Sequence, residues 1–292
     1  MLIDLMSLNL DNEEIDKIIQ NSLIEDLGEN YLDVTTDSLI SNDISSIAYI
    51  KTREKCVISG MDIAKNVFQK IDPALDLEVF YSDGDKVQSD QALLKVSGSA
   101  ASILKGERVA LNFLQRMCGI SSLTAEFLKK SNRQDLLILD TRKTTPGIRI
   151  IEKLAVKYVG VTNHRKGLFD AVMIKDNHFL ILERENNIGI NSAIKKVRAK
   201  NPNLQIHVEV DTVEQLKKIL SVPPDWVLLD NMSINDLKKC VKLCQNKCKT
   251  EASGDISLEN IKEVASTGID AVSIGALTHS AKSVNLGLDF LV

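Results

Sequence analysis

The sequence lacks any run of about 18 or more apolar residues, the length that a membrane-spanning helix requires. Its opening stretch, MLIDLMSLNLDNEEIDKII, lacks the basic head and unbroken apolar core of a signal peptide, because acidic residues interrupt it. A strong charge of one sign is also missing, since the net charge is only −4. That balance gives no reason to expect nucleic acid or an anionic membrane as a partner. We therefore expect a cytoplasmic protein without membrane or nucleic-acid partners.

Cysteine is scarce, and the number of cysteines, five, is odd. An odd number without a secretion signal favours reduced thiols. Cys240, Cys244 and Cys248 are spaced four apart, which places them on one face of a helix. No histidine is close to them in sequence, and the spacing differs from the usual zinc patterns. We interpret the three as small apolar residues of a helix face, and the sequence leaves any further role open.

The composition that remains, with 44% hydrophobic and 26% charged residues, is typical of a globular protein. The 292 residues suffice for one large or two ordinary domains. Helical periodicity covers 12–26 and a short helix fits 61–70, whereas alternating patterns predict strands. The strand-like runs are SIAYIKT, KCVISG, LEVFYSDGDKV and ALLKVSG. The first hundred residues therefore predict an α+β unit, and an apolar stripe over 101–130 predicts a long helix or two abutting ones.

From about residue 135 short apolar runs alternate with helical stretches, a pattern typical of parallel strands buried on both faces. The runs are LLILD, AVMIK, IHVEV, WVLLD, KTEAS and AVSIG, and the helical stretches are 191–200, 212–220, 233–246 and 257–267. We favour a β/α barrel over an open parallel sheet. The runs end at Asp140, Lys175, Glu209 or Val210, Asp230, Ser253 and Gly275. At the carboxyl ends of barrel strands such side chains converge on one mouth, where active sites are found.

Basic residues gather in the segments that leave these strands. They are Arg142, Lys143 and Arg149 in LDTRKTTPGIR, His164, Arg165, Lys166, Lys175 and His178 in NHRKGLFDAVMIKDNH, and Lys105, Arg108 and Arg116 upstream. Arginine suits carboxylates and phosphates because its planar fork makes two parallel charge-assisted hydrogen bonds. In a protein of net negative charge this concentration of cations predicts a polyanionic ligand.

Two carboxylates, Glu209 and Asp230, end neighbouring predicted strands and would repel a polyanion. A divalent cation between them resolves the conflict, and Mg²⁺ prefers oxygen ligands that it shares with a substrate phosphate. The segments EASGDI (251–256) and SIGALTHS (273–280) each place small residues where a strand gives way to a helix. Backbone N–H groups approach a phosphate closely at such positions.

Taken together, KGERVALNFLQR, LDTRKTTPGIR, NHRKGL, MIKDNH, HVEVDT, LLDNM, EASGDI and SIGALTHS resemble the quinolinate phosphoribosyltransferase family, and EDLG followed by DVTT resembles its N-terminal signature. The resemblance runs in order over nearly the whole chain. It implies transfer of phosphoribose from phosphoribosyl pyrophosphate to quinolinate with loss of CO₂, giving nicotinate mononucleotide. The implied reaction requires no organic cofactor, and the resemblance implies Mg²⁺ held beside Glu209 and Asp230.

The resemblance also implies residue roles. Arg142, Lys143, His164, Arg165 and Lys175 would line the dicarboxylate and ribose-phosphate pocket, with Lys143, Glu209 and Asp230 nearest the chemistry. Ser253, Gly254, Gly275 and Ala276 would hold the 5′-phosphate. Arg108 would be donated to quinolinate across the interface of a homodimer or dimer-based oligomer.

The implied fold is an N-terminal α/β sandwich domain over 1–115, joined by the tail 278–292, followed by an incomplete, open β/α barrel over 116–277. Two places depart from the family pattern. The stretch Val159–Thr162 replaces a glycine-rich loop with stiffer residues, and Asp255 replaces a second glycine. These departures put substrate affinity in question.

Three other functions are compatible with the pattern. The first is a phosphoribosyltransferase of the same build with a different anionic acceptor, which the altered loop before His164 keeps open. The second is a lyase in which Lys143 or Lys175 forms a Schiff base, although paired carboxylates and phosphate-type loops fit it poorly. The third is a non-catalytic binding protein on the same scaffold.

Overall fold

The computed structural model describes residues 12–41, 43–186 and 189–291. Residues 1–11, which begin the stretch that argues against a signal peptide, lie outside the described part. The described chain divides into two compact units: unit 1 comprises 126–143 and 161–276, and unit 2 comprises 12–125, 144–160 and 277–291. The sequence-based division at residue 115 falls inside helix α4 (Ala100–Ser131), which runs on through both units.

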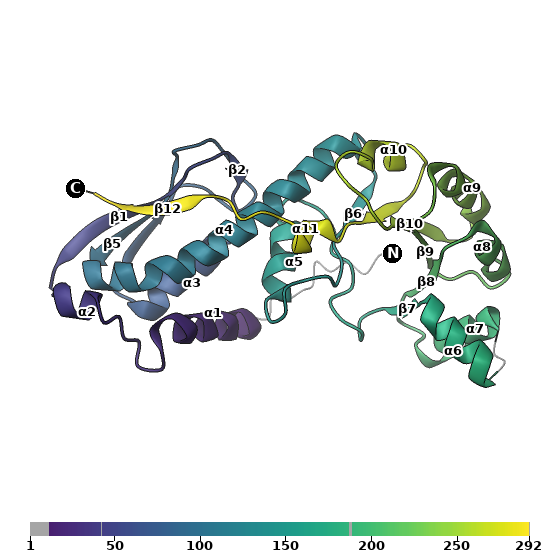
Figure 1. The fold of residues 1–292 in the computed structure, drawn as a ribbon, viewed down its shortest axis with the longest axis horizontal. Coiled ribbons are helices and arrows are strands. Elements are labelled where there is room, and N and C mark those ends of the chain that lie inside the picture. The colour runs from purple at the N-terminus through teal and green to yellow at the C-terminus, as the bar shows by residue number, and fades with distance from the viewer. Residues whose placement is uncertain (1–11, 42, 187–188, 292) are drawn as a thin grey trace. The chain divides into compact units, whose positions relative to one another are not determined.

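Unit 1 is built on a six-stranded parallel sheet with the order β6-β11-β10-β9-β8-β7 (Figure 1). Its strands are β6 (Leu137–Leu139), β7 (Val172–Ile174), β8 (Ile206–Val210), β9 (Trp226–Asp230), β10 (Lys249–Ser253) and β11 (Ala271–Ser273). In this sheet β6, the first strand of unit 1 along the chain, pairs with β11, the last one. The described residues show no pairing between β6 and β7, so the sheet does not close. The expected open β/α barrel is therefore confirmed.

The crossover helices of unit 1 are α6 (Asp176–Asn186), α7 (Ile190–Lys200), α8 (Val213–Ile219), α9 (Ile234–Cys244), α10 (Ile261–Ala265) and α11 (Ala276–His279), whose last three residues belong to unit 2. The predicted helix over 257–267 is shorter than expected, because its first residues form a turn in which Asn260 Oδ1 accepts from Ser257 N. Helix α6 was not predicted. Cys240 and Cys244 are buried on one face of α9, as expected, and Cys248 lies beyond its end.

Side chains of unit 1 alternate between the two faces of the sheet, and the strand register shows which residues share a face. His207 lies opposite Trp226, Glu209 opposite Leu228, and Leu228 opposite Glu251. Leu139, Trp226 and Ala271 pack together as a buried cluster, which marks this face as the inner one. The inner face therefore carries an apolar layer together with polar residues of β8, β9 and β10.

Unit 2 is an antiparallel sheet of order β12-β1-β5-β3, a two-stranded sheet of β2 and β4, and helices. The strands are β1 (Ser45–Thr52), β2 (Cys56–Val57), β3 (Asp76–Val79), β4 (Lys86–Val87), β5 (Ala92–Ser99) and β12 (Leu286–Phe290). The helices are α1 (Asn12–Leu27), α2 (Thr36–Leu39), α3 (Met61–Ile71), most of α4, and α5 (Arg149–Lys157). Strand β12 pairs along β1, so residues late in the chain complete this sheet, as the resemblance implied.

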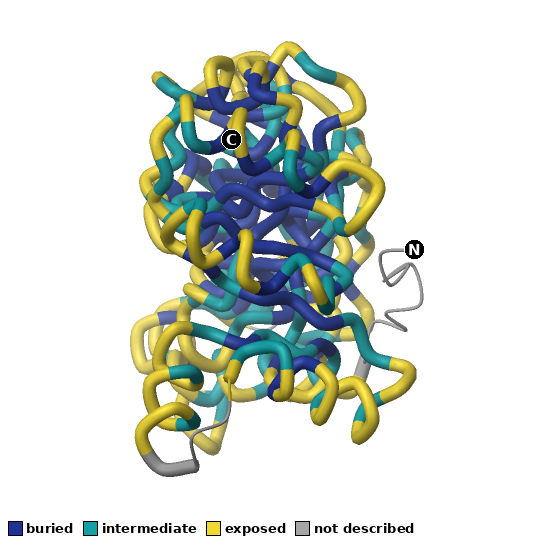
Figure 2. Tube along the Cα trace, turned by 90° about the vertical axis from the view of Figure 1, so that its right-hand side faces the viewer, coloured by how far each residue is buried: buried dark blue, intermediate teal, exposed yellow. Residues whose placement is uncertain are grey.

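Buried residues gather in the interior and exposed residues along the outside of the tube (Figure 2). In unit 2 the edge strands β3 and β12 are largely half-buried or exposed. Among the described residues, no helix combines the length and the apolar character that crossing a membrane demands.

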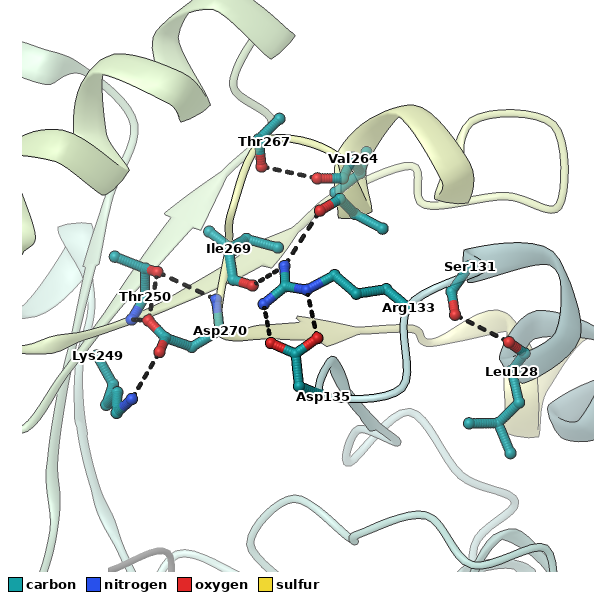
Figure 3. A network of polar contacts seen from close by, with 11 residues as sticks. Leu128, Ser131, Arg133, Asp135, Lys249, Thr250, Val264, Thr267, Ile269 and Asp270 are labelled. Atoms are coloured by element: carbon teal, nitrogen blue, oxygen red, sulfur yellow. Dashed lines mark hydrogen bonds and ion pairs between the residues drawn. The ribbon is translucent and has the colours of Figure 1, made fainter.

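A polar network joins the amino ends of three strands of unit 1 (Figure 3). The Asp270 carboxylate accepts hydrogen bonds from Lys249 Nζ at 2.7 Å, and from Thr250 N at 2.9 Å and Thr250 Oγ1 at 2.8 Å. Its backbone oxygen accepts from Leu137 N, so Asp270 ties β10 and β6 to β11. Beside it, the Arg133 guanidinium binds Asp135 and the backbone oxygens of Ala265 and Ile269.

In unit 2 a second network fixes the segment that follows Lys143. Glu152 on α5 is fully buried and accepts hydrogen bonds from Arg116 Nε at 3.0 Å and from Arg116 Nη2 at 2.7 Å. The same carboxylate accepts from Thr145 N at 3.0 Å and Thr145 Oγ1 at 2.9 Å. Arg149 Nε donates to Thr144 Oγ1 in the same turn. This basic-rich loop is therefore tied to α4 and α5 by charge-assisted bonds.

Replacing Asp270 by alanine should lower the free energy of unfolding by about 1–3 kcal/mol, because Thr250 N loses its acceptor. Burial raises the pKa of Asp270, but bonds from Lys249 and Thr250 outweigh it, so the pKa lies below its ordinary value. Its contribution is then complete above the unfolded-state pKa of about 3.9 and disappears as pH falls through the lower folded-state pKa. Urea unfolding of the wild type and of Asp270→Ala at several pH values measures this contribution. As a control, Asp62→Asn at an exposed position should change the free energy of unfolding little. An effect of Asp270→Ala that does not depend on pH would refute the assignment.

Glu152→Ala should destabilise the protein by about 3 kcal/mol or more, because it leaves a largely buried arginine without its counter-charge. The loop after Lys143 should also loosen, so trypsin should cleave after Lys143 and Arg149 faster than in the wild type. Glu126→Ala, at an exposed position of α4, is the control. Unchanged cleavage at these two sites would show that Glu152 does not hold the loop.

Candidate functional site

Three of the predicted residues lie at the carboxyl ends of neighbouring strands in unit 1. Glu209 at the end of β8 forms an ion pair with Lys175, which directly follows β7. Asp230 ends β9, and its Oδ2 accepts from Asn231 Nδ2 at 2.9 Å. Glu209 and Asp230 occupy the same face, because Glu209 lies opposite Leu228, two residues before Asp230. The expected convergence of charged strand ends is therefore present for this group.

Asp140, directly after β6, organises the segment that carries the predicted residues His164 and Arg165. Its side chain is fully buried. Oδ1 accepts from His164 N at 2.7 Å and Oδ2 accepts from Asn163 Nδ2 at 3.0 Å. The preceding Thr162 makes a parallel bridge to Leu139, so its β-branched side chain suits the extended backbone at this point. The stiffness of Val161 and Thr162 thus extends the sheet edge locally.

Two arginines of this unit lie close enough to influence each other. Burial lowers the pKa of Arg165, and the neighbouring Arg142 guanidinium lowers it further. Arg165 Nη1 donates to Ala171 O at 3.0 Å, and both side chains are half-buried. Lys143, which follows Arg142 in the sequence, is exposed. Clustered cations that disfavour each other's charge are stabilised by an anion bound between them.

The proposed phosphate segments lie at the ends of adjacent strands β10 and β11. Gly254 has φ +91° and faces Asn231, and a Cβ at this position would meet the Asn231 side chain at 2.1 Å. Only glycine fits there. Asp255 has φ +47°, a left-handed conformation in which a second glycine would be unstrained, and its side chain is exposed. Ser253, Gly275 and Ala276 are half-buried.

Arg108 belongs to unit 2, on helix α4. Its side chain is 58% exposed, and Nη2 is 4.0 Å from Glu107 Oε1. The other eleven predicted site residues all belong to unit 1: Arg142, Lys143, His164, Arg165, Lys175, Glu209, Asp230, Ser253, Gly254, Gly275 and Ala276.

Two polar residues of the inner face were missed by the sequence interpretation. His207 is 4% exposed and stacks on Trp226 with ring centroids 5.8 Å apart and planes 8° apart. Glu251 is fully buried on β10. The signal for His207 was available, because IHVEV alternates polar and apolar residues with a period of two, whereas KTEAS shows no such alternation around Glu251. The prediction of continuous apolar strands was therefore wrong for both runs.

The oxygen atoms of Glu209 and Asp230 fit the donor preference of Mg²⁺. They lie on one face of adjacent strands, and Asp230 Oδ1 is not used by the bond to Asn231. The Lys175 ammonium pairs with Glu209, so it would compete with a cation for that carboxylate. The residues present therefore offer the oxygen ligands that magnesium prefers, provided that Lys175 releases Glu209.

Comparisons with known proteins agree over nearly the whole chain. The model of the quinolinate phosphoribosyl transferase N-terminal domain matches residues 33–118, and that of the C-terminal domain matches residues 120–289. A mitochondrial quinolinate phosphoribosyltransferase [decarboxylating] of Nicotiana glauca is 38% identical, with 94% of this chain and 82% of the relative covered. A probable nicotinate-nucleotide pyrophosphorylase [carboxylating] of Bacillus subtilis is 36% identical, with 94% and 93% covered.

Solved structures give the same result. The nicotinate-nucleotide pyrophosphorylase of Francisella tularensis superposes with a TM-score of 0.88 at 34% identity, covering 96% of this chain and 97% of that one. NadC of Streptococcus pyogenes superposes with a TM-score of 0.90 at 33% identity, covering 98% and 100%. With both domain models matched in order and relatives above one third identity, the chain belongs to the quinolinate phosphoribosyltransferase family.

Proposed function

We propose that this protein transfers the phosphoribosyl group of phosphoribosyl pyrophosphate to quinolinate, with decarboxylation, and so makes nicotinate mononucleotide for NAD biosynthesis. Family membership over both domains is the observation that carries this conclusion. The electrostatic interaction between Arg142 and Arg165 supports it, because two cations that disfavour each other's charge suit a ligand such as quinolinate, which presents two carboxylates.

The reaction forms two bonds and breaks two. The pyridine nitrogen of quinolinate attacks C1 of the ribose, and pyrophosphate leaves with the electron pair of the C1–O bond. The ring nitrogen is then quaternary and accepts electron density, so the adjacent carboxylate departs as CO₂ and its former carbon takes up a proton. The substrate's own ring is the electron sink, which is why no organic cofactor is required.

The roles of the residues follow from their charge and position. Arg142, Lys143 and Arg165 bind the carboxylates of quinolinate and orient its nitrogen. Positive charge develops on the ribose in the transition state, and the carboxylates Glu209 and Asp230 stabilise it. The backbone at Ser253, Gly254, Gly275 and Ala276 receives the 5′-phosphate, since Gly254 keeps that approach open.

Glu209 and Asp230 are also the residues that would hold magnesium, which when bound neutralises charge on the pyrophosphate leaving group. Lys175 pairs with Glu209 and adds a positive charge beside the same position. This pairing also argues against a Schiff-base lyase, because such a lysine must be an unprotonated amine.

The first prediction from this function is direct. Purified protein with quinolinate, phosphoribosyl pyrophosphate and Mg²⁺ should release nicotinate mononucleotide and CO₂ in equal amounts. A chelator should abolish both, and Lys143→Ala should lower kcat/KM by on the order of 100-fold or more, because a cation at the substrate is lost. Nicotinate offered in place of quinolinate separates a different acceptor from the proposed one. Product without CO₂ would contradict the proposal.

We also propose a homodimer in which Arg108 completes the quinolinate site of the partner subunit. The exposed side chain of Arg108, 58% accessible to solvent, supports this, because it leaves the guanidinium available to a ligand of another subunit. The five cysteines, free in the structure, suit a reducing compartment, and we place the protein in the cytoplasm.

Shared sites have a measurable signature. Arg108→Ala should raise KM for quinolinate by on the order of tenfold to 100-fold and leave KM for phosphoribosyl pyrophosphate nearly unchanged. At quinolinate concentrations below the wild-type KM both Arg108→Ala and Lys143→Ala should be weakly active, and mixing their subunits should restore about a quarter of the wild-type activity, because each mixed dimer regains one intact site. If mixing after dissociation and reassociation restores nothing, Arg108 acts within its own subunit or not at all.

A further inference from the structure

A buried polar cluster lies within unit 1, on the inner face of the sheet. It consists of His164, His207, Glu251 and Ser273, with exposures of 9%, 4%, 0% and 5%. His164 lies in the segment between α5 and β7, whereas His207, Glu251 and Ser273 lie on β8, β10 and β11. The reaction described above does not use Glu251. Burying a carboxylate is costly unless its bonds are made, so its presence requires an explanation.

Glu251 is held as an anion by the groups around it. Oε1 accepts a hydrogen bond from Ser273 Oγ, and His164 Nε2 is 3.3 Å from the same oxygen. Oε2 faces His207 Nδ1 at 3.5 Å, a distance longer than an ordinary hydrogen bond.

The ring of His164 has one tautomer that fits its contacts. Arg165 N donates a hydrogen bond to His164 Nδ1 at 2.7 Å, so Nδ1 carries a lone pair and no proton. The proton of the neutral ring must then be on Nε2, where it points at the Glu251 carboxylate. The Arg165 backbone and Glu251 therefore select the same tautomer from opposite sides of the ring.

The same tautomer argues against a metal centre at this place. The ligand atoms of His164, His207 and Glu251 lie within 4.8 Å of one another, which by distance alone suits a divalent transition metal. A metal requires the lone pair of each imidazole nitrogen that faces it. His164 presents an N–H there instead, so the cluster is a set of hydrogen bonds.

The consequence falls on Arg165. Asp140 accepts from His164 N at 2.7 Å, and Glu251 accepts from the His164 ring, so two fully buried carboxylates from β10 and the end of β6 hold one residue. His164 in turn accepts from Arg165 N, which fixes the backbone from which the Arg165 guanidinium extends. The hydrogen bond from Arg165 Nη1 to Ala171 O then sets the direction of the guanidinium group.

We infer that Glu251 is a positioning residue of the quinolinate site, which acts by locking His164 in the Nε2–H tautomer and thereby aiming Arg165. The inference rests on the proposed function for its kinetic consequence, and on geometry alone for the tautomer. Glu251 itself does not touch the substrate, because it is fully buried. The orientation of a substrate-binding cation is preorganised by the shell behind it.

The tautomer is measured first, without substrates. The chain has four histidines, so protein labelled with ¹⁵N only in histidine gives few ring signals, and His164→Gln assigns one of them. Long-range ¹H–¹⁵N correlation should show the His164 proton on Nε2 in the wild type. A proton on Nδ1, or a doubly protonated ring, would overturn the inference whatever the enzyme does. Zinc that binds the wild type tightly and perturbs both His164 and His207 would overturn it too, in favour of a metal centre.

Two variants at the same position then test the consequence. Glu251→Gln keeps an acceptor oxygen for His164, so the tautomer should persist and KM for quinolinate should stay within about threefold of wild type. Glu251→Leu removes the acceptor, so the tautomer should be lost and KM for quinolinate should rise about tenfold or more, with KM for phosphoribosyl pyrophosphate nearly unchanged. Equal loss of both affinities in the leucine variant would refute a role in positioning Arg165.

Ser273→Ala is the matched control, because it removes another bond to Glu251 Oε1 and leaves His164 untouched. It should keep the tautomer and a quinolinate KM within about threefold of wild type. If Glu251→Leu does not fold, the wild-type tautomer and the retained affinity of Glu251→Gln still decide the question. Absence of nicotinate mononucleotide from the wild type would count against the proposed function, and direct calorimetric binding of quinolinate would still test the positioning role.

Discussion

The strict alternation of side chains along six parallel strands is the constraint on which the site depends. It sends His207, Glu209, Asp230 and Glu251 to one face, although they come from three strands. A slip of one residue in any strand would turn its polar side chains into the apolar layer beneath the helices. The register that makes the core is therefore the same register that assembles the chemistry, and neither can change alone.

The carboxylates of unit 1 have different roles according to how deeply they are buried. Glu209 and Asp230 at the strand ends remain available to solvent and ligand, whereas Asp140 and Glu251 are closed off by protein donors. The half-buried pair at the strand ends can change partners during a reaction, because the Lys175 side chain that pairs with Glu209 is itself partly exposed. The buried pair cannot, and so serves as fixed support for the residues above it.

Much of this arrangement was predictable from the sequence. Apolar runs ending in Asp140, Lys175 and Asp230 marked the strands and their ends, and the helices 12–26 and 61–70 were placed closely. Helix α5 was not predicted, although Ile150, Ile151 and Leu154 recur at helical spacing in RIIEKLAVK (149–157). Glu251 was missed because its role is defined by residues on other strands, at distances that a linear pattern does not encode.

The pairing of β12 with β1 has a consequence for synthesis on the ribosome. Strand β1 emerges early, yet its outer edge stays unpaired until residues 286–290 have left the exit tunnel. Unit 1 is translated in between, so it can collapse while the first sheet still lacks a strand. A nascent chain of this kind exposes an unpaired strand edge, which can pair with other chains and aggregate, for most of its elongation. Slow translation late in the message would prolong this exposure.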